Sequence, residues 1–230
     1  MSPRRLPLRL YRYLTTLAMV TGLTACASGP PAPDWQGNVK SALDQATAAY
    51  LAGDGAGDAR AFERAREALG STGRPELMAR AELMRCAARV ASLVFEPCAG
   101  FERLRSDAAQ AERAYAEHLL ARTLPRDAIE RLPVAQRGAA TAIATGKAAD
   151  AGLQGIADPL SRLIAAAVLF QAGLASPATI ALAADTASAQ GWRRPLLAWL
   201  DVQAQLAERG GAVEEAQRLR RRIALVQGGR

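Results

Sequence analysis

The chain has 230 residues, with 29 basic and 22 acidic side chains, and its formal net charge is +7. Four of the arginines and no acidic residue lie in residues 1–25, so the rest of the chain carries only 25 − 22 = +3. Nucleic-acid binding needs a concentrated basic face, and this small excess argues against a nucleic-acid partner.

Residues 1–25 have the order of a secretory signal peptide. Arginines stand at positions 4, 5, 9 and 12, a mostly apolar segment covers 13–23, and small side chains follow. This order is typical of a signal peptide that is removed after export. The apolar part is too short for a transmembrane helix, which needs roughly 20 residues.

The tetrapeptide Leu23-Thr24-Ala25-Cys26 resembles the lipobox of bacterial lipoproteins. The resemblance implies cleavage just before Cys26, a diacylglyceryl group on its thiol and usually a third acyl chain on its amine. Two or three chains would anchor the protein stably, whereas one would not. The other interpretation is a buried cysteine in a chance match.

The residues after Cys26 predict where the anchored protein goes and how its domain is attached. In enterobacterial lipoproteins an Asp after the cysteine retains the protein in the inner membrane. Ala27 stands there, so the resemblance favours the outer membrane. The segment 26–37 is predicted to be the lipidated cysteine and a Pro- and Gly-rich tether.

Residues 38–230 are predicted to form an all-helical periplasmic domain. Alanine, the strongest helix former, occupies 53 of the 230 positions, and the alternating β-branched runs typical of strands are missing. The sequence leaves open one domain or two halves, 38–121 and 122–230. The helices are expected at 38–52, 58–70, 75–92, 98–121, 126–145 with a break at Pro133 as an option, 147–155, 159–173, 177–190, 194–209 and 212–227.

Two helix starts and the last helix have clear local signals. Asp158-Pro159 and Ser176-Pro177 each place a capping side chain before a proline at the first helical position. In the last helix Glu214 and Arg218 form an i, i+4 pair on the polar face. Its expected apolar face consists of Val213, Ala216, Leu219, Ile223 and Val226.

Residues 204–219, AQLAERGGAVEEAQRL, resemble the turn and second helix of a tetratricopeptide repeat through Gly211 and Ala216. Residues 169–183 show the same spacing through Gly173 and Ala178, and residues 48–69 are similar with a longer turn. The resemblance implies stacked helical hairpins, with an irregular helical bundle as the alternative. The whole chain also resembles alanine-rich lipoproteins of Gram-negative bacteria, a likeness that implies no activity.

The residue types that carry chemistry are sparse. His118 is the only histidine, and a dyad with Cys98 would need to span roughly 30 Å if 98–121 were one helix. The motifs of serine hydrolases, phosphate-binding loops and thiol redox sites are missing. The carboxylates in GDGAGD, residues 53–58, do not have the spacing of a calcium loop. The sequence therefore predicts no catalytic residue, no metal and no cofactor.

Cys86 and Cys98 are predicted to form a disulfide, because an oxidising compartment favours joining the two cysteines that remain after Cys26 is acylated. Bridged Cα atoms lie about 4.4–6.8 Å apart. This distance is reached easily if the helix that carries Cys86 ends at Ala91 and the chain folds back. Two buried free thiols are the alternative.

Two further groups have both a structural and a functional interpretation. Trp192 and Trp199 lie seven residues apart, which suits core packing or a ridge that binds a partner. The densest basic cluster contains four arginines, which suit a solvated face or contact with phosphate groups or an acidic partner. These are Arg218, Arg220, Arg221 and Arg222.

Taken together, these features predict an outer-membrane lipoprotein without catalytic activity that binds an envelope protein or peptide. Lipoproteins with helical domains serve as pilotins and assembly factors, an analogy at the level of fold. The alternative is an envelope hydrolase acting on peptidoglycan or polysaccharide. Its cleft would need a catalytic carboxylate.

Overall fold

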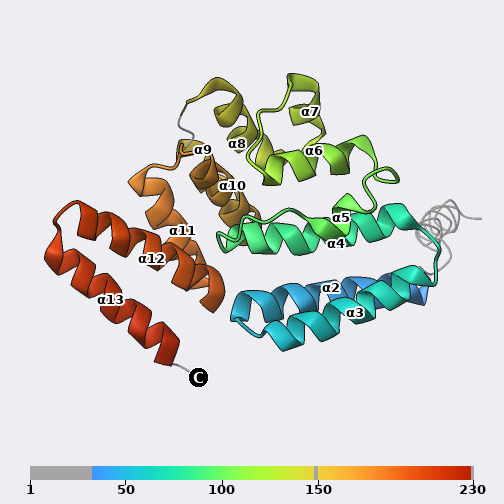
Figure 1. Cartoon of the computed structure of the whole chain (residues 1–230), viewed down its shortest axis with the longest axis horizontal. Helices are drawn as coiled ribbons and strands as arrows, with labels where there is room; N and C mark the ends of the chain where they lie inside the picture. The colour runs from blue at the N-terminus through green and yellow to red at the C-terminus, as the bar shows by residue number, and fades with distance from the viewer. Residues whose placement is uncertain (1–32, 148–149, 229–230) are drawn as a thin grey trace, which may run out of the picture. The chain divides into compact units, whose positions relative to one another are not determined.

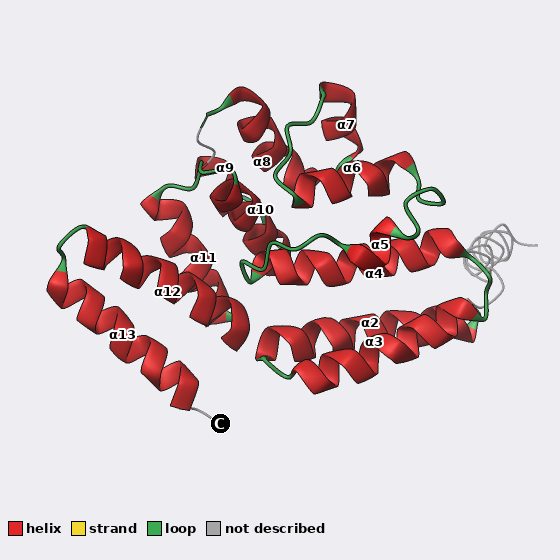
Figure 2. Ribbon diagram, viewed as in Figure 1, coloured by secondary structure: helices red, strands yellow, loops and turns green. Residues whose placement is uncertain are grey.

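The computed structural model describes residues 33–147 and 150–228, and the contacts group Trp35–Arg230 into one compact unit. Within the described residues the chain forms twelve helices and no strand, which confirms the all-α prediction (Figures 1 and 2). The helices are α2 (Asp34–Ala52), α3 (Gly55–Gly70), α4 (Pro75–Ala91), α5 (Ala99–Glu102), α6 (Gln110–Leu119), α7 (Arg126–Arg131), α8 (Val134–Thr145), α9 (Asp150–Gln154), α10 (Pro159–Gln171), α11 (Pro177–Ala189), α12 (Arg193–Arg209) and α13 (Val213–Gly228).

Local capping explains where several of these helices begin. The Asp158 carboxylate accepts a hydrogen bond of 2.7 Å from the backbone N–H of Ser161, at the start of α10. The Ser176 hydroxyl accepts one of 3.1 Å from the N–H of Thr179, at the start of α11. Both predicted caps are confirmed, because a capping side chain satisfies N–H groups that the first helical turn leaves free.

The predicted helix 98–121 is wrong. It is two helices, α5 and α6, joined by a series of turns from 103 to 109. Ser106 and Asp107 lie in these turns, where short polar side chains compete with helical hydrogen bonding. The Arg105 guanidinium then binds Glu102 of α5 at 2.7 Å and Glu117 of α6 at 3.0 Å. The estimate of 30 Å between Cys98 and His118 assumed one helix and does not hold.

Several other boundaries differ from the expected ones, and α3 begins at Gly55 instead of 58 and α9 covers only Asp150–Gln154. The tether was expected to reach residue 37, but α2 begins at Asp34. An acidic residue suits a first helical turn, and Trp35 packs against the core of α2 and α3. The helix expected at 126–145 is broken at Pro133 into α7 and α8, which is the option that the proline suggested.

The main core is built from small side chains around one tryptophan. The buried cluster runs from Ala79 to Leu219 and so crosses the position between residues 121 and 122 at which two halves were considered. Helix α10 lies at its centre and packs against α4, α8 and α11. Trp199 is fully buried, and its indole N–H donates to the carbonyl of Ala91 at 3.2 Å. Trp192 is partly buried against the same core, so both tryptophans are packing residues and form no exposed ridge.

The last hairpin, α12 and α13, fits the expected turn only in part. Gly211 has φ +72°, which a residue with a Cβ rarely adopts, and Ala216 is buried as expected. At the second proposed repeat Gly173 also has positive φ, but Ala178 is exposed and cannot mediate a close helix contact. Val213 was expected on the apolar face of α13 and is 63% exposed.

The expected pair of Glu214 with Arg218 is also wrong. The Arg218 guanidinium binds Glu215 instead, at 2.6 Å. Residues three and four apart on a helix are both within reach of a long side chain, so the choice between the two glutamates is a matter of side-chain geometry. The pairing does not alter the polar character of this face.

Candidate functional site

The predicted lipidation site, Cys26, lies outside the described residues, as does the signal peptide 1–25. The other predicted site residues lie within them. The structure brings Cys86 and Cys98 together, and it pairs two of the four arginines of the basic cluster with carboxylates. It also forms a groove that the sequence did not indicate.

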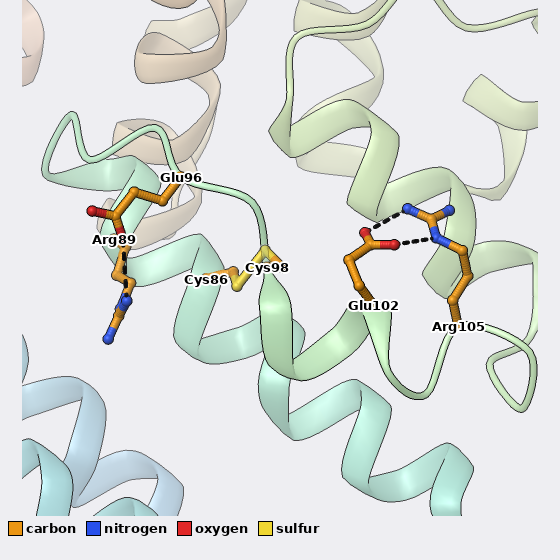
Figure 3. Close-up of a disulfide and its surroundings, with 6 residues drawn as sticks. All are labelled: Cys86, Arg89, Glu96, Cys98, Glu102 and Arg105. Carbon is orange, nitrogen blue, oxygen red and sulfur yellow. Dashed lines mark hydrogen bonds and ion pairs between the residues drawn. A yellow bond between two sulfur atoms is a disulfide. The ribbon is translucent and has the colours of Figure 1, made fainter.

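Cys86 and Cys98 lie at disulfide distance, with Cα atoms 5.9 Å apart (Figure 3). Helix α4 ends at Ala91, as this pairing requires, and Leu93 turns the chain back with φ +59°. Cys98 is buried in the main core and directly precedes α5. The pair therefore links the middle of α4 to the start of α5, whose Phe101 is fully buried. With the Cys98 sulfur bound in this way, no Cys–His dyad is formed.

The arginines at 218–222 are partly neutralised by the protein itself. Arg220 binds Glu208 at 2.9 Å and Asp201 at 2.7 Å, both on α12, and the hydrogen bond to Glu208 is the main cause of its raised pKa. Arg218 binds Glu215. Arg221 is exposed and Arg222 half-buried. Since two of the four cations hold neighbouring carboxylates, the cluster does not form a preorganised anion site.

His118 is fully buried and takes part in a polar chain between α6, α8 and α10. Its Nε2 lies 3.1 Å from the Oε1 of Gln136, whose amide donates to the carbonyl of Ser161 at 2.9 Å. The Nδ1 atom is buried without a partner among the described residues. Burial lowers the pKa of His118 to about 4, so the ring is neutral at pH 7. This environment holds the helices together and places no nucleophile beside the ring.

The two buried carboxylates are each held by an arginine. Asp58 binds Arg85 at 3.1 Å, and the guanidinium of Arg85 also lies 4.5 Å from the centre of the Phe62 ring. Glu82 lies 3.6 Å from Arg66. A general acid for glycan cleavage needs a protonated carboxyl in an apolar pocket. Each of these two carboxylates instead has an arginine as its partner and does not face an apolar pocket alone, so neither suits that role.

Two adjoining hollows with largely apolar walls lie along α4. The first, about 440 Å³, lies between α4, α6 and the α7–α8 junction, with Leu83, Tyr115, Leu132 and Val134 among its apolar walls. Both hollows include Arg80 and Met84 of α4. Ligand sites of proteins are typically about 300–1,000 Å³.

The second hollow, about 360 Å³, lies between α2, the end of α3 and α4, with Trp35, Val39, Leu43 and Leu77 among its apolar walls. We call the two hollows together, on the two sides of Arg80 and Met84, the α4 groove. Met84 is 42% exposed in it, and Val134 at its far wall is 78% exposed. Large apolar side chains exposed beside a hollow mark a surface that can be covered by a ligand.

The α4 groove is predominantly basic. Five cationic side chains line it: Lys40, Arg74, Arg80, Arg131 and Arg137. Only two carboxylates do so, Asp44 and Glu112. The hollow at the α12–α13 turn, in contrast, is lined by two glutamates and two arginines. A basic excess is therefore a property of the α4 groove and not of every hollow on the surface.

The sequence did not single out this groove. Its cations come from positions 40 to 137 and from four different elements, so no local charge cluster indicates them. Met84 sits within the apolar pattern of α4, where it looks like one more core residue. Its exposure follows from the way α4 packs, which no spacing in the sequence reports.

No protein-family model matches the chain, and neither curated protein sequences nor solved structures show a significant match. Within the described residues, no helix combines the length and the hydropathy needed to cross a membrane. The same part of the chain contains no group of three or more His, Cys, Asp or Glu side chains that could hold a metal ion.

Proposed function

We propose that the protein is a lipid-anchored outer-membrane protein without catalytic activity, whose periplasmic helical domain binds another envelope protein or peptide. The α4 groove is the observation that carries the binding role, because it combines exposed apolar side chains with a charged rim. Cores of protein interfaces are apolar and enriched in Met and aromatic residues, with a polar rim around them. The lipobox at Cys26 carries the anchoring role.

The helical hairpins support the same role by analogy. Tetratricopeptide-like hairpins commonly present surfaces for peptides and proteins, and the α12–α13 turn shares the glycine and the buried alanine of that pattern. Pilotins and assembly factors are the corresponding classes of lipoprotein, a likeness of fold alone. The alternative of an envelope hydrolase is disfavoured, because the buried carboxylates Asp58 and Glu82 are each paired with an arginine.

Replacing the lipidated cysteine tests the anchor. Cys26→Ser is expected to abolish acylation and leave an uncleaved precursor, because the lipobox supplies both the cleavage site and the acylated thiol. Incorporation of an alkyne-tagged palmitate, cell fractionation and intact mass report the outcome. Cys86→Ser serves as the matched control and should still be acylated. A wild-type protein without acyl mass, or one that starts at a residue other than Cys26, would contradict the proposal.

A photoreactive side chain at the centre of the α4 groove tests the binding role. Benzoylphenylalanine is placed at Met84 or, as the control, at Leu225 of α13, which is apolar and 78% exposed. We expect adducts with an envelope protein at Met84 and roughly tenfold fewer at Leu225, because hot spots cluster at the centre of an interface. Mass spectrometry of cross-linked cells identifies the partner segment. Adducts with lipid alone, or none at Met84, would refute the role of the groove.

A further inference from the structure

Three cations of the α4 groove form exposed ion pairs with carboxylates of the protein, and the carboxylates of an acidic ligand can take the place of these partners. Lys40 binds Asp44 at 2.6 Å, Arg74 binds Glu76 at 2.7 Å and Arg131 binds Asp127 at 2.6 Å. Exposed pairs of this kind contribute roughly 0–1 kcal/mol each. A ligand carboxylate can therefore take over these cations at small cost.

Two of these pairs are made by carboxylates that do not line the hollows, Glu76 and Asp127. Hydrogen bonding from Arg74 lowers the pKa of Glu76, and hydrogen bonding from Arg131 lowers that of Asp127. Even with both included beside Asp44 and Glu112, four carboxylates face five cations. Arg137 holds only the carbonyl of Leu132, at 2.9 Å, and pairs with no carboxylate of the described chain.

A buried acceptor in the groove distinguishes a peptide from a phosphate group. The Nε–H of Arg80 donates a hydrogen bond of 3.0 Å to Oε1 of Glu112. The other oxygen, Oε2, is buried and has no hydrogen-bond partner in the described structure. The Glu112 carboxylate therefore repels a phosphate group held beside Arg80. A peptide can place its carboxylates at the other cations of the groove and its uncharged backbone over Glu112.

We propose that the α4 groove binds an acidic peptide segment with apolar side chains, presented by the envelope partner of the proposed function on which this inference rests. The apolar side chains enter the two hollows on either side of Met84. Carboxylates of the segment bind Arg74, Arg131 and Arg137 at the rim, and its uncharged backbone passes over Glu112. Complementary charge at the rim selects the partner, and the apolar contacts hold it.

Selection from random peptides tests this specificity on the full chain in detergent micelles. Twelve-residue peptides displayed on phage are selected on the wild type and, in parallel, on the double variant Arg74→Glu/Arg131→Glu. A second variant, Met84→Glu, places one negative charge between the hollows at an exposed position. The control, Arg221→Glu/Arg222→Glu, makes the same double charge change on α13. Circular dichroism confirms that each variant is folded.

We expect the wild type and the α13 control to select peptides that combine Asp or Glu with large apolar residues. Fluorescein-labelled copies should bind both groove variants about tenfold more weakly. The double variant loses two charge contacts, and Met84→Glu places a negative charge between the two apolar hollows. Their affinity should also fall as salt screens the charges. Neutral or basic selected peptides, equal binding by the groove variants, or no selected peptide would overturn the inference. Groove-dependent binding of phosphatidylglycerol vesicles without peptide binding would overturn it in favour of lipid.

The two proposals fail in different ways. Photo-adducts from Met84 with a partner segment that lacks acidic residues would remove this inference and leave the proposed function intact. Adducts with no protein at all would remove the proposed function, whatever peptides the isolated groove selects.

Discussion

Reduction of the link between Cys86 and Cys98 is expected to lower the free energy of unfolding by about 3 kcal/mol. The two residues are 12 apart in sequence, and in the chain-entropy model a cross-link over a loop of this size restricts the unfolded chain by about that amount. For a chain of this length the loss corresponds to a fall in melting temperature of roughly 6–12 °C. Thermal unfolding with and without a phosphine reductant measures it.

The matched control removes both sulfurs. Cys86→Ala/Cys98→Ala should melt near the reduced wild type and should not respond to reductant. Thiol titration is done in the Cys26→Ser background, so that Cys86 and Cys98 are the only cysteines present. Two titratable thiols in unreduced, denatured protein would show that the bridge does not form. An unchanged melting temperature on reduction would show that it does not stabilise the fold.

Acidification below pH 6.5 is expected to destabilise the domain through His118. Its pKa in the folded state, about 4, lies below the unfolded value of 6.5, so the unfolded chain binds the proton more readily. The stability that neutral His118 contributes is complete above pH 6.5 and is lost as pH falls toward 4. This difference between the folded and unfolded pKa values corresponds to a loss of at most about 3 kcal/mol in the free energy of unfolding.

The variant His118→Gln isolates this contribution from the titration of carboxylates. Glutamine can still hydrogen-bond to Gln136 but does not titrate, so its stability should fall less between pH 6.5 and 4. Urea unfolding at intervals across this range gives the difference between the two curves. A histidine resonance titrating near pH 6.5 in the folded protein, or two parallel stability curves, would contradict a buried neutral ring.

Features that depend on neighbours in sequence could be predicted from the sequence itself. The caps at Asp158 and Ser176 need only a side chain and an N–H three residues later. The proximity of Cys86 and Cys98 needs only that α4 end at Ala91, because the twelve-residue separation limits how far the chain can travel. The all-helical class follows in the same way from alanine content and from the punctuation by proline and glycine.

Features that depend on contacts between distant segments were decided by the tertiary structure alone. The helix expected at 98–121 is instead α5 and α6, and Arg105 in the turns between them binds Glu102 of α5 and Glu117 of α6, contacts that no spacing in the sequence indicates. The helical spacing places Val213 and Val226 on the same expected apolar face of α13. Only the packing of α13 on α12 determines that Val213 is exposed and Val226 is partly covered.

The α4 groove belongs to the second class throughout. Arg80 and Glu112 are 32 residues apart, and Met84 is exposed only because α2 and α6 leave the surface of α4 uncovered between two hollows. Sequence spacing determines which residues share a face of one helix. It does not determine which faces meet or which remain open, because burial is settled by the packing of all helices together. The sequence alone therefore indicated the type of fold and the pairing of Cys86 with Cys98, and it predicts the anchor, whereas the tertiary structure alone revealed the α4 groove.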